Sequence, residues 1–254
     1  MSKPLILVSN DDGITSKGIR LLVETMKELG EVVVVAPDGP QSGMGHAITI
    51  ENPLRLYPTD IFSGVSAYEC SGTPADCVKL AKHRVLKDRT ADLVVSGVNH
   101  GSNTSVSVLY SGTMSAAIEG AMEELPAIGF SYCDYSHEAN VDHIKEYVHQ
   151  IASNVLEKGL PKGIALNVNI PAKEKGEIKG IKVCRQARAK WQEEYEERFD
   201  PYRRKYYWMA GSFVNFDRGE DNDEWAINNG YISVVPCKFD LTAGDILNDL
   251  ESRF

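Results

Sequence analysis

Two adjacent acidic residues near the N-terminus are the strongest chemical signal in this sequence. Asp11 and Asp12 follow the apolar run Leu5 to Val8 and precede Gly13. A short run of branched aliphatic residues that stops at polar turn residues is typical of a buried parallel strand, and open α/β sheets bind ligands at the carboxyl ends of such strands. Neighbouring carboxylates there repel each other and resist desolvation, so they need a cation or a proton. A hard divalent metal ion meets that need, although Asn-Asp-Asp-Gly is also ordinary turn chemistry.

Polar residues at three later positions could share a site with these acids. A loop rich in glycine and proline contains Ser42 and Gly43, whose hydroxyl and N–H groups could approach a ligand or belong to a plain surface loop. Asn99 follows the apolar run at 92–98, and an amide oxygen is an acceptable ligand for Mg²⁺, Mn²⁺ or Ca²⁺. The turn Ser111-Gly112-Thr113 enters a helix rich in small residues, which indicates either a phosphate site at a helix N-terminus or ordinary capping.

These residues need a parallel sheet to bring them together. Apolar residues at helical spacing separate the runs at 5–8 and 31–37, which predicts a right-handed βαβ unit. We therefore expect a Rossmann-like, three-layer α/β/α sandwich with a mostly parallel sheet, in which the strand ends that carry Asp11 and Asn99 share one edge. The other expected elements are an antiparallel excursion of short strands at 46–50, 54–57 and 66–70, helices at 74–85, 112–120 and 141–156, and strands at 126–132 and 163–171.

Three familiar motifs of nucleotide, phosphate or calcium sites are absent or incomplete. No G-x-G-x-x-G follows the first strand, which removes the main support for a nicotinamide or flavin enzyme. Aspartyl phosphatases of the haloacid-dehalogenase type resemble D-x-D-x-[TV], but Gly13 stands two positions after Asp11. The pair Asp221 and Asp223 lacks the other ligands of a calcium loop, so we assign it to helix capping.

Composition limits the class of partner. The chain has 254 residues and a net charge of -9, which argues against a surface that coats nucleic acid. Its five cysteines are scattered without a C-x-x-C pair, so neither a disulfide framework nor a structural zinc site is expected. The chain enters a strand almost at once and has no apolar run of transmembrane length, so we expect a cytoplasmic protein without a membrane partner.

The character of the sequence changes after residue 180. We expect residues 1–180 to form the Rossmann-like core and residues 181–254 to supply a β-hairpin and a C-terminal helical arm for oligomerisation, with a strand at 231–235 as a candidate to return to the core. The stretch 189–208 is dense in charged and aromatic residues, which suits a hairpin packed on another subunit, and a solvated hairpin on the same subunit is the alternative. A last helix is expected to open at Asp240.

Five motifs, in this order, resemble the stationary-phase survival protein SurE family. They are Ile6 to Gly13, Ser42-Gly43 after a Val-Val-Ala-Pro strand, Ser71 to Val78, Ser96 to Asn103, and Ser111 to Ala117. The resemblance extends to 240–242, and the hairpin at 190–217 matches least well. It implies a metal-dependent phosphomonoesterase, a 5′-nucleotidase acting on nucleoside monophosphates, with 3′-nucleotidase or exopolyphosphatase activity beside it. It also implies homodimers or homotetramers built through swapped C-terminal elements.

The resemblance further implies a set of site residues. One Mg²⁺ or Mn²⁺ ion per subunit would be held by Asp11, Asp12, Ser42 and Asn99. The candidate catalytic residues are Asp11, Asp12 and Asn99, and the candidate substrate and phosphate-binding residues are Asn10, Ser42, Gly43, Asn99, Ser111, Gly112 and Thr113. His46 is taken first as the start of a strand and only weakly as the acid for the leaving group, and no role is attached to His100.

This set fits attack by a metal-activated water in line with the leaving alkoxide. Asn99 and the start of the helix at Ser111 would stabilise charge on the phosphoryl oxygens. Two alternatives remain. One is a metal-dependent nucleotide-binding or sensor protein that occupies the same crevice without turnover, and the other is a phosphatase with Asp11 as nucleophile, which predicts a trapped aspartyl phosphate.

Overall fold

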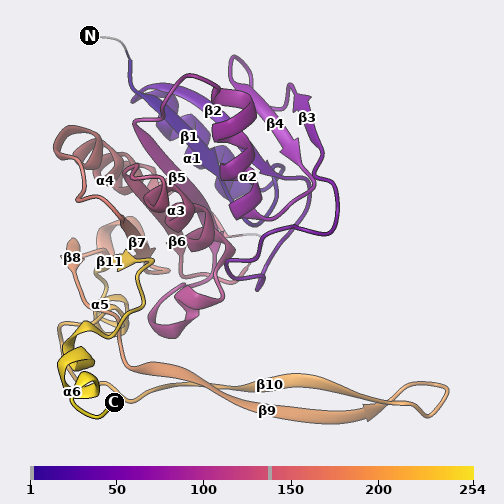
Figure 1. Ribbon diagram of the computed structural model, residues 1–254, viewed down its shortest axis with the longest axis vertical. Coiled ribbons are helices and arrows are strands. Elements are labelled where there is room, and N and C mark those ends of the chain that lie inside the picture. Colours follow the sequence, from indigo (N-terminus) through magenta and orange to yellow (C-terminus); the bar gives the residue numbers. More distant parts are fainter. Residues whose placement is uncertain (1–2, 137–138) are drawn as a thin grey trace.

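A nine-stranded sheet forms the centre of the molecule (Figure 1). The computed structural model describes residues 3–136 and 139–254. In spatial order the strands are β3 (Leu56–Thr59), β4 (Ser66–Cys70), β2 (Glu31–Pro37), β1 (Leu5–Ser9), β5 (Leu93–His100), β6 (Ala127–Tyr132), β7 (Ile164–Ile170), β11 (Ile232–Lys238) and β8 (Ile181–Val183). The six strands from β4 to β7 are parallel, whereas β3 and β11 run antiparallel to β4 and β7. The expected mostly parallel sheet is confirmed.

Helices cover both faces of this sheet and complete the three layers. One face carries α1 (Lys17–Lys27) and α4 (Lys145–Lys158), and the other carries α2 (Pro74–Leu80), which continues as a π-helical turn at Ala81–Leu86, and α3 (Gly112–Met122). Alternate residues of β1 serve the two layers, because Ile6 packs on the α1 side and Leu7 on the α3 side. A strand that is buried on both faces favours apolar residues at successive positions, which explains the continuous apolar run from Leu5 to Val8.

The segment after the Ser42 loop differs from the expectation. Residues 46–50 form no strand, so that prediction was wrong, while β3 and β4 form the expected antiparallel pair. Hydrogen bonds to side chains, and not pairing with another strand, hold this segment. The backbone N–H of Thr49 donates to Asp76 Oδ1 at 3.1 Å, and the hydroxyl of Thr73 donates to the carbonyl oxygen of Ala47 at 2.7 Å. Asp76 also completes a capping box with Thr73, as its position in the first turn of α2 suggested.

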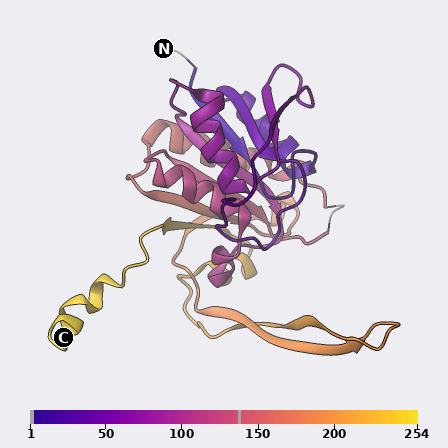
Figure 2. The same cartoon turned by 45° about the vertical axis from the view of Figure 1, so that its right-hand side comes forward.

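Beyond residue 180 the chain both rejoins the sheet and leaves it. Strands β8 and β11 extend the sheet next to β7, whereas β9 (Ala189–Phe199) and β10 (Lys205–Asn215) form a separate two-stranded hairpin. Figures 1 and 2 show this hairpin and the C-terminal segment projecting away from the body in different directions. The remaining helical segments are η2 (Ser105–Leu109), η3 (Asp142–Ile144), η4 (Lys175–Glu177), α5 (Asp223–Asn228), η5 (Gly244–Ile246) and α6 (Leu247–Glu251).

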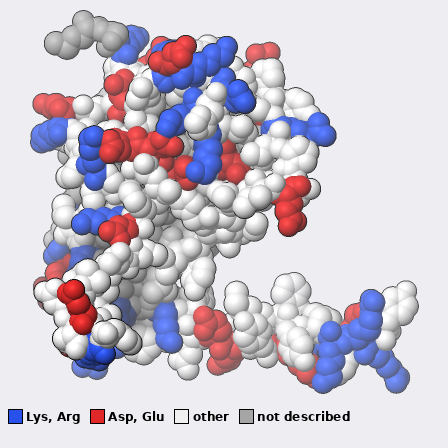
Figure 3. All heavy atoms as spheres, viewed as in Figure 1, with Lys and Arg blue, Asp and Glu red and all other residues white. Residues whose placement is uncertain are grey.

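The last helix begins later than expected. Asp240 accepts the backbone N–H of Thr242 at 2.9 Å, so this stretch is a turn and the regular helix α6 starts only at Leu247. Across the described ranges, every helix is too short or too polar to cross a membrane. On the face shown in Figure 3, acidic and basic side chains are interspersed over the body and along the hairpin.

Candidate functional site

The carboxyl ends of β2, β1 and β5 meet around a cavity of about 220 Å³. The chain passes from β1 to β2 on one side and later returns to β5 on the other side, which makes this edge a topological switch point of the sheet. Five of the predicted site residues line the cavity together, namely Asp11, Ser42, Gly43, Asn99 and Ser111. They come from four separate parts of the sequence.

Asp11 is buried against the start of α3. Its side chain accepts a hydrogen bond from the Thr113 hydroxyl at 2.5 Å, and the residue is only 4% exposed. Gly112 permits this approach, because a Cβ atom there would lie 2.6 Å from the Cβ of Asp11. Burial, and to a lesser extent the charge of Asp12, raises the pKa of Asp11 to about 6 even though the Thr113 hydrogen bond opposes the shift. A buried acid of this kind is a position where a cation would replace a proton.

Asp12 contacts a residue to which the sequence analysis attached no role. Its Oδ2 lies 3.2 Å from Nδ1 of His100, and both side chains are largely buried. The parallel register explains the meeting. Ser9 pairs with Ser96, so Asp12, three residues after Ser9, and His100, at the end of β5, come to the same edge of the sheet. The signal available in the sequence was that His100 directly follows Asn99 at a strand end. We therefore add His100 to the site.

The loop with Ser42 and Gly43 is tied to the rest of the site through its backbone. The N–H of Gln41 donates to the carbonyl oxygen of Asp11 at 2.7 Å, and the N–H of Gly45 donates to the carbonyl oxygen of Tyr110 at 3.1 Å. Gly43 has a φ of +74°, a conformation that suits glycine. These bonds hold the Ser42 hydroxyl beside Asp11 at the cavity.

The position of Asn99 depends on a β-bulge in β5. Ser96 pairs with Gly129 of β6, but Asn99 pairs with Ser131, so β5 carries one extra residue between the two pairs. The Asn99 amide nitrogen donates to the carbonyl oxygens of His100 at 3.1 Å and Gly101 at 2.9 Å. Because the nitrogen is held by the backbone, the amide oxygen is the end that can bind a cation.

The start of α3 lies at the same cavity. Ser111 is the N-cap, and its hydroxyl accepts the N–H of Met114 at 3.0 Å. A helix N-terminus carries N–H groups without helical partners and the positive end of the dipole, so it favours an anion. The predicted phosphate turn is thus in place, with Thr113 bound to Asp11 and Gly112 providing the space between them.

Asn10, like Asp12, Gly112 and Thr113, is not among the residues that line the cavity. It is fully buried, and its amide nitrogen donates to the carbonyl oxygen of Gly13 and to the Ser16 hydroxyl, both at 2.9 Å. Its side chain therefore braces the turn that presents Asp11 and Asp12.

A sequence profile of the family described as "Survival protein SurE" matches residues 6–193. The chain belongs to the SurE family. A relative from Cytophaga hutchinsonii, named "5′-nucleotidase SurE", is 70% identical over 250 residues, which cover 98% of this chain and 96% of the relative. A second relative of that name, from Christiangramia forsetii, is 58% identical over 252 residues, with coverage of 98% and 96%. The crystal structure of the SurE protein from Aquifex aeolicus is 40% identical, covers 98% of this chain and 99% of its own, and superimposes with a TM-score of 0.85.

The ligand set in this SurE chain suits a hard cation. Within residues 3–136 and 139–254, no group of three or more His, Cys, Asp or Glu side chains is arranged to hold a metal ion. The set predicted here differs in kind, because a hydroxyl and an amide oxygen from Ser42 and Asn99 accompany the two carboxylates. Oxygen donors of mixed charge are what Mg²⁺ and Mn²⁺ accept, and the buried acid Asp11 lacks a nearby basic partner among its main interactions. The residues present therefore fit a divalent metal ion.

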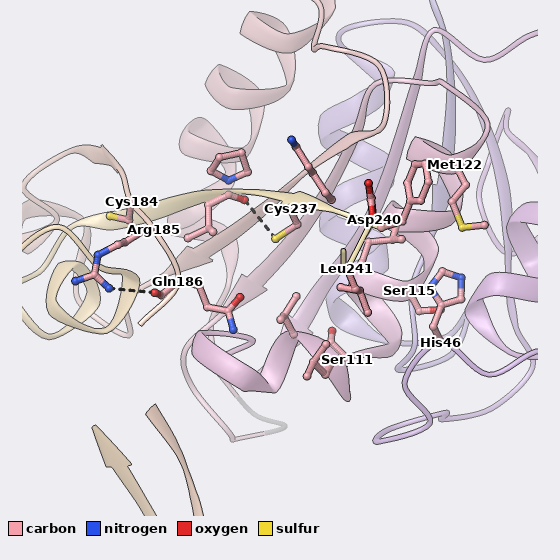
Figure 4. Close-up of a pocket in the computed structure, with 17 residues that line it drawn as sticks. His46, Ser111, Ser115, Met122, Cys184, Arg185, Gln186, Cys237, Asp240 and Leu241 are labelled. Atoms are coloured by element: carbon pink, nitrogen blue, oxygen red, sulfur yellow. Dashed lines mark hydrogen bonds between the residues drawn. The ribbon is translucent and has the colours of Figure 1, made fainter. Parts of the chain in front are cut away.

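A larger cavity of about 790 Å³ lies beside α3 (Figure 4). It is lined mainly by apolar side chains and by the start of the C-terminal segment, and it shares only Ser111 with the candidate site. His46 belongs to this cavity, where its Nε2 lies 3.0 Å from Glu119 Oε2. The position of His46 gives no support to a role in protonating a leaving group. We place the chemistry in the smaller cavity because Asp11 and Asn99 line it, together with His100, the partner of Asp12.

Proposed function

We propose that this chain is a 5′-nucleotidase that hydrolyses nucleoside monophosphates with the help of one divalent metal ion per subunit. The observation that carries the proposal is the meeting of Asp11, Ser42, Asn99 and Ser111 around one cavity at the switch point of the sheet, with Asp12 beside them. Membership of the SurE family, and relatives up to 70% identical that bear the name 5′-nucleotidase, support the activity.

Asp11, Asp12, Ser42 and Asn99 are the residues that would hold Mg²⁺ or Mn²⁺. When bound, such an ion neutralises phosphate charge and lowers the pKa of a water molecule that it carries. Thr113 keeps the carboxylate of Asp11 oriented, and the backbone of residues 100–101 keeps the amide of Asn99 oriented. Fixed ligands need no rearrangement when charge develops on the phosphate.

The start of α3 is the proposed phosphate-binding element. The phosphoryl oxygens would accept the N–H groups of the first turn, and Ser111 and the loop of Ser42 and Gly43 would close the sides. Because these groups contact only the phosphoryl group, the proposal extends to 3′-nucleotides and to the ends of short polyphosphate. Water is the nucleophile, so no phosphorylated Asp11 should accumulate.

The test is release of inorganic phosphate from a panel of 5′- and 3′-nucleoside monophosphates and tripolyphosphate, with Mg²⁺, Mn²⁺ or a chelator. We expect metal-dependent release by the parent and none above background by Asp12→Asn. Asp60→Asn changes an exposed carboxylate away from the cavity and serves as the control. Nucleotide binding by a parent that releases no phosphate under any metal would replace the enzyme with the sensor, and a trapped aspartyl phosphate would replace water with Asp11 as nucleophile.

Oligomerisation through the C-terminal region is the second part of the proposal. Large exposed apolar side chains are concentrated in the hairpin and the C-terminal segment, including Tyr195, Tyr207, Met209, Leu241, Leu247 and Phe254. A two-stranded ribbon that projects into solvent is only marginally stable by itself. We propose a homodimer or homotetramer in which these surfaces are covered by other copies of the chain, with light scattering of the purified protein as the test.

The proposed compartment is the cytoplasm. All five cysteines are free thiols, and three of them, Cys70, Cys77 and Cys184, are buried. Free thiols suit a reducing compartment, and fractionation of the native cells with detection by antibody tests this assignment.

A further inference from the structure

Two exposed aromatic residues line the same cavity as Asp11. Tyr110 and Trp191 line it together with Asp11, and they remain 58% and 44% exposed. Tyr110 is attached to the Ser42 loop, because its carbonyl oxygen accepts the N–H of Gly45 at 3.1 Å. The exposed parts of both rings border a polar cavity, where they are available to a ligand with an apolar face.

Buried polar contacts fix the base of the hairpin where Trp191 lies. The Ser105 hydroxyl accepts the N–H of Ala189 at 3.0 Å and donates to its carbonyl oxygen at 2.6 Å. Asp223 accepts the N–H groups of both Ser105 and Ala187 at 2.9 Å. All these groups are buried, so the first residues of β9 are held firmly against η2 and α5.

The same contacts determine the direction of the Trp191 side chain. Side chains alternate along a strand, so Trp191 is on the same face of β9 as Ala189, which is buried against the body. Phe213 stands directly opposite on β10, with ring centroids 5.8 Å apart and planes at 67°. This edge contact restrains the indole and covers at most one of its faces.

The size of the cavity leaves the base of a nucleotide outside it. Its volume of about 220 Å³ is below the roughly 300–1,000 Å³ of ordinary small-molecule pockets. A phosphate at Asp11 and the start of α3, with the sugar beside it, would occupy much of this volume, so the base would extend to the rim where the two rings are exposed.

We propose that Trp191, assisted by Tyr110, is the platform on which the base of the nucleotide stacks. This inference rests on the proposed nucleotidase function and names its specificity element. Stacking uses the π face that every base has and does not read the hydrogen-bonding edge. The enzyme therefore accepts all common bases and favours purines modestly, since larger rings stack more strongly.

The experiment compares a substrate that has a base with one that has none. We measure kcat and KM for AMP, CMP and ribose 5-phosphate with the parent, Trp191→Ala, Trp191→Phe and Tyr110→Ala, and the affinity for AMP in chelator by calorimetry. Trp191→Ala should raise KM and Kd for AMP by roughly 10-fold, and should raise them less for CMP. It should leave kcat and the constants for ribose 5-phosphate within about twofold, and Trp191→Phe should restore most of the affinity for AMP.

Trp208→Ala is the matched control, because Trp208 is an exposed indole of the same hairpin that does not line the cavity. It should behave like the parent. Unchanged affinity of Trp191→Ala for AMP, or equal losses with AMP and ribose 5-phosphate, would overturn the stacking role. If the parent does not hydrolyse ribose 5-phosphate, the affinities for AMP and ribose 5-phosphate measured by calorimetry test the stacking role by the same criteria. Failure of the parent to hydrolyse any nucleotide would instead refute the proposed function itself.

Discussion

The carboxyl edge of the sheet and the β9–β10 hairpin differ in how far they are buried and in what they contact. Strand β1 is buried along its whole length, and the residues that follow it are held by a backbone hydrogen bond to the end of β2 and by side-chain contacts to β5 and α3. Strand β9 is buried only at its first residue and is exposed from there to its tip, with its partner strand as its only neighbour in the sheet pairing. The first region is specified by contacts inside the chain. The second exposes many of its large apolar side chains, and the proposals above place a substrate against its base and another subunit farther along.

The sharpest test of this contrast is Asp11→Asn. Activity should fall by at least about 10²-fold, because the variant loses a fixed charge where the phosphate charge is balanced. The metal-free variant should unfold at the same temperature or higher, since a buried carboxylate has been removed. Phosphate release and thermal unfolding in chelator measure the two effects, and a variant that loses stability and activity together would show that Asp11 is a packing residue.

Gly112→Ala tests how tightly the edge is packed. The added Cβ would stand 2.6 Å from the Cβ of Asp11, so we expect a loss of about 1–3 kcal/mol in the free energy of unfolding and weaker metal binding. Gly244→Ala is the control in the C-terminal segment, where a Cβ would meet no atom within 4 Å. Urea unfolding of the two variants gives the comparison, and equal stabilities would mean that the edge tolerates change as easily as the tail.

His100→Ala tests the contact that the sequence did not reveal. Without the imidazole, Asp12 loses the partner at 3.2 Å, and we expect Mn²⁺ affinity measured by calorimetry to fall by about 10- to 100-fold. His100→Gln, which keeps an N–H donor, should recover part of the loss. His149→Ala removes a surface histidine and should bind metal as the parent does. Normal affinity in His100→Ala would show that the contact plays no part in holding Asp12.

Metal affinity should also depend on pH through Asp11. The pKa of its carboxyl, about 6 in the metal-free protein, lies above the usual value, so the ion must displace a proton at low pH and none at high pH. Affinity should be nearly constant above pH 7 and fall about tenfold from pH 7 to pH 5. The chelated protein shows the opposite dependence, because Asp11 stabilises the fold when protonated and this contribution is lost as pH rises through about 6. A pH-independent affinity in both the parent and His100→Gln would contradict this assignment.

The smallest effect on chemistry is expected in the tail. Leu247 of α6 is 53% exposed, and Leu247→Asp should weaken the proposed oligomer while changing kcat/KM by less than about twofold, because α6 contributes no lining residue to the site. Light scattering gives the mass and phosphate release gives the activity. An unchanged oligomer would remove α6 from the interface, and a large loss of activity would mean that another subunit completes the site.

Features that depend on neighbouring residues in the sequence, such as buried strands and helix caps, were mostly predicted correctly. The apolar runs within 5–8, 31–37 and 92–98 lie in buried parallel strands, as continuous branched aliphatic residues between turn residues predict. The cap considered at Ser111 follows the same local logic, since a side-chain acceptor next to free N–H groups needs no distant partner. The cap assigned to Asp221 and Asp223 is made by Asn222, which lies between them, while Asp221 pairs with Arg185. Where a distant side chain competes, local patterns fail, as at Thr49, which bonds to Asp76 and prevents the strand expected at 46–50.

The sequence by itself thus determined which functional groups follow each element. Acids follow β1, a serine loop follows β2, an amide stands at the end of β5, and a capped turn precedes α3. Only the tertiary structure decided which side chains meet. His100 reaches Asp12 because β5 and β1 are parallel neighbours with a fixed register, and Trp191 reaches the cavity because buried Asp223 and Ser105 tie the hairpin to η2. Residues 88 positions apart in the first pair and 118 in the second have no local signal that joins them. Their contact depends on the packing of the whole chain.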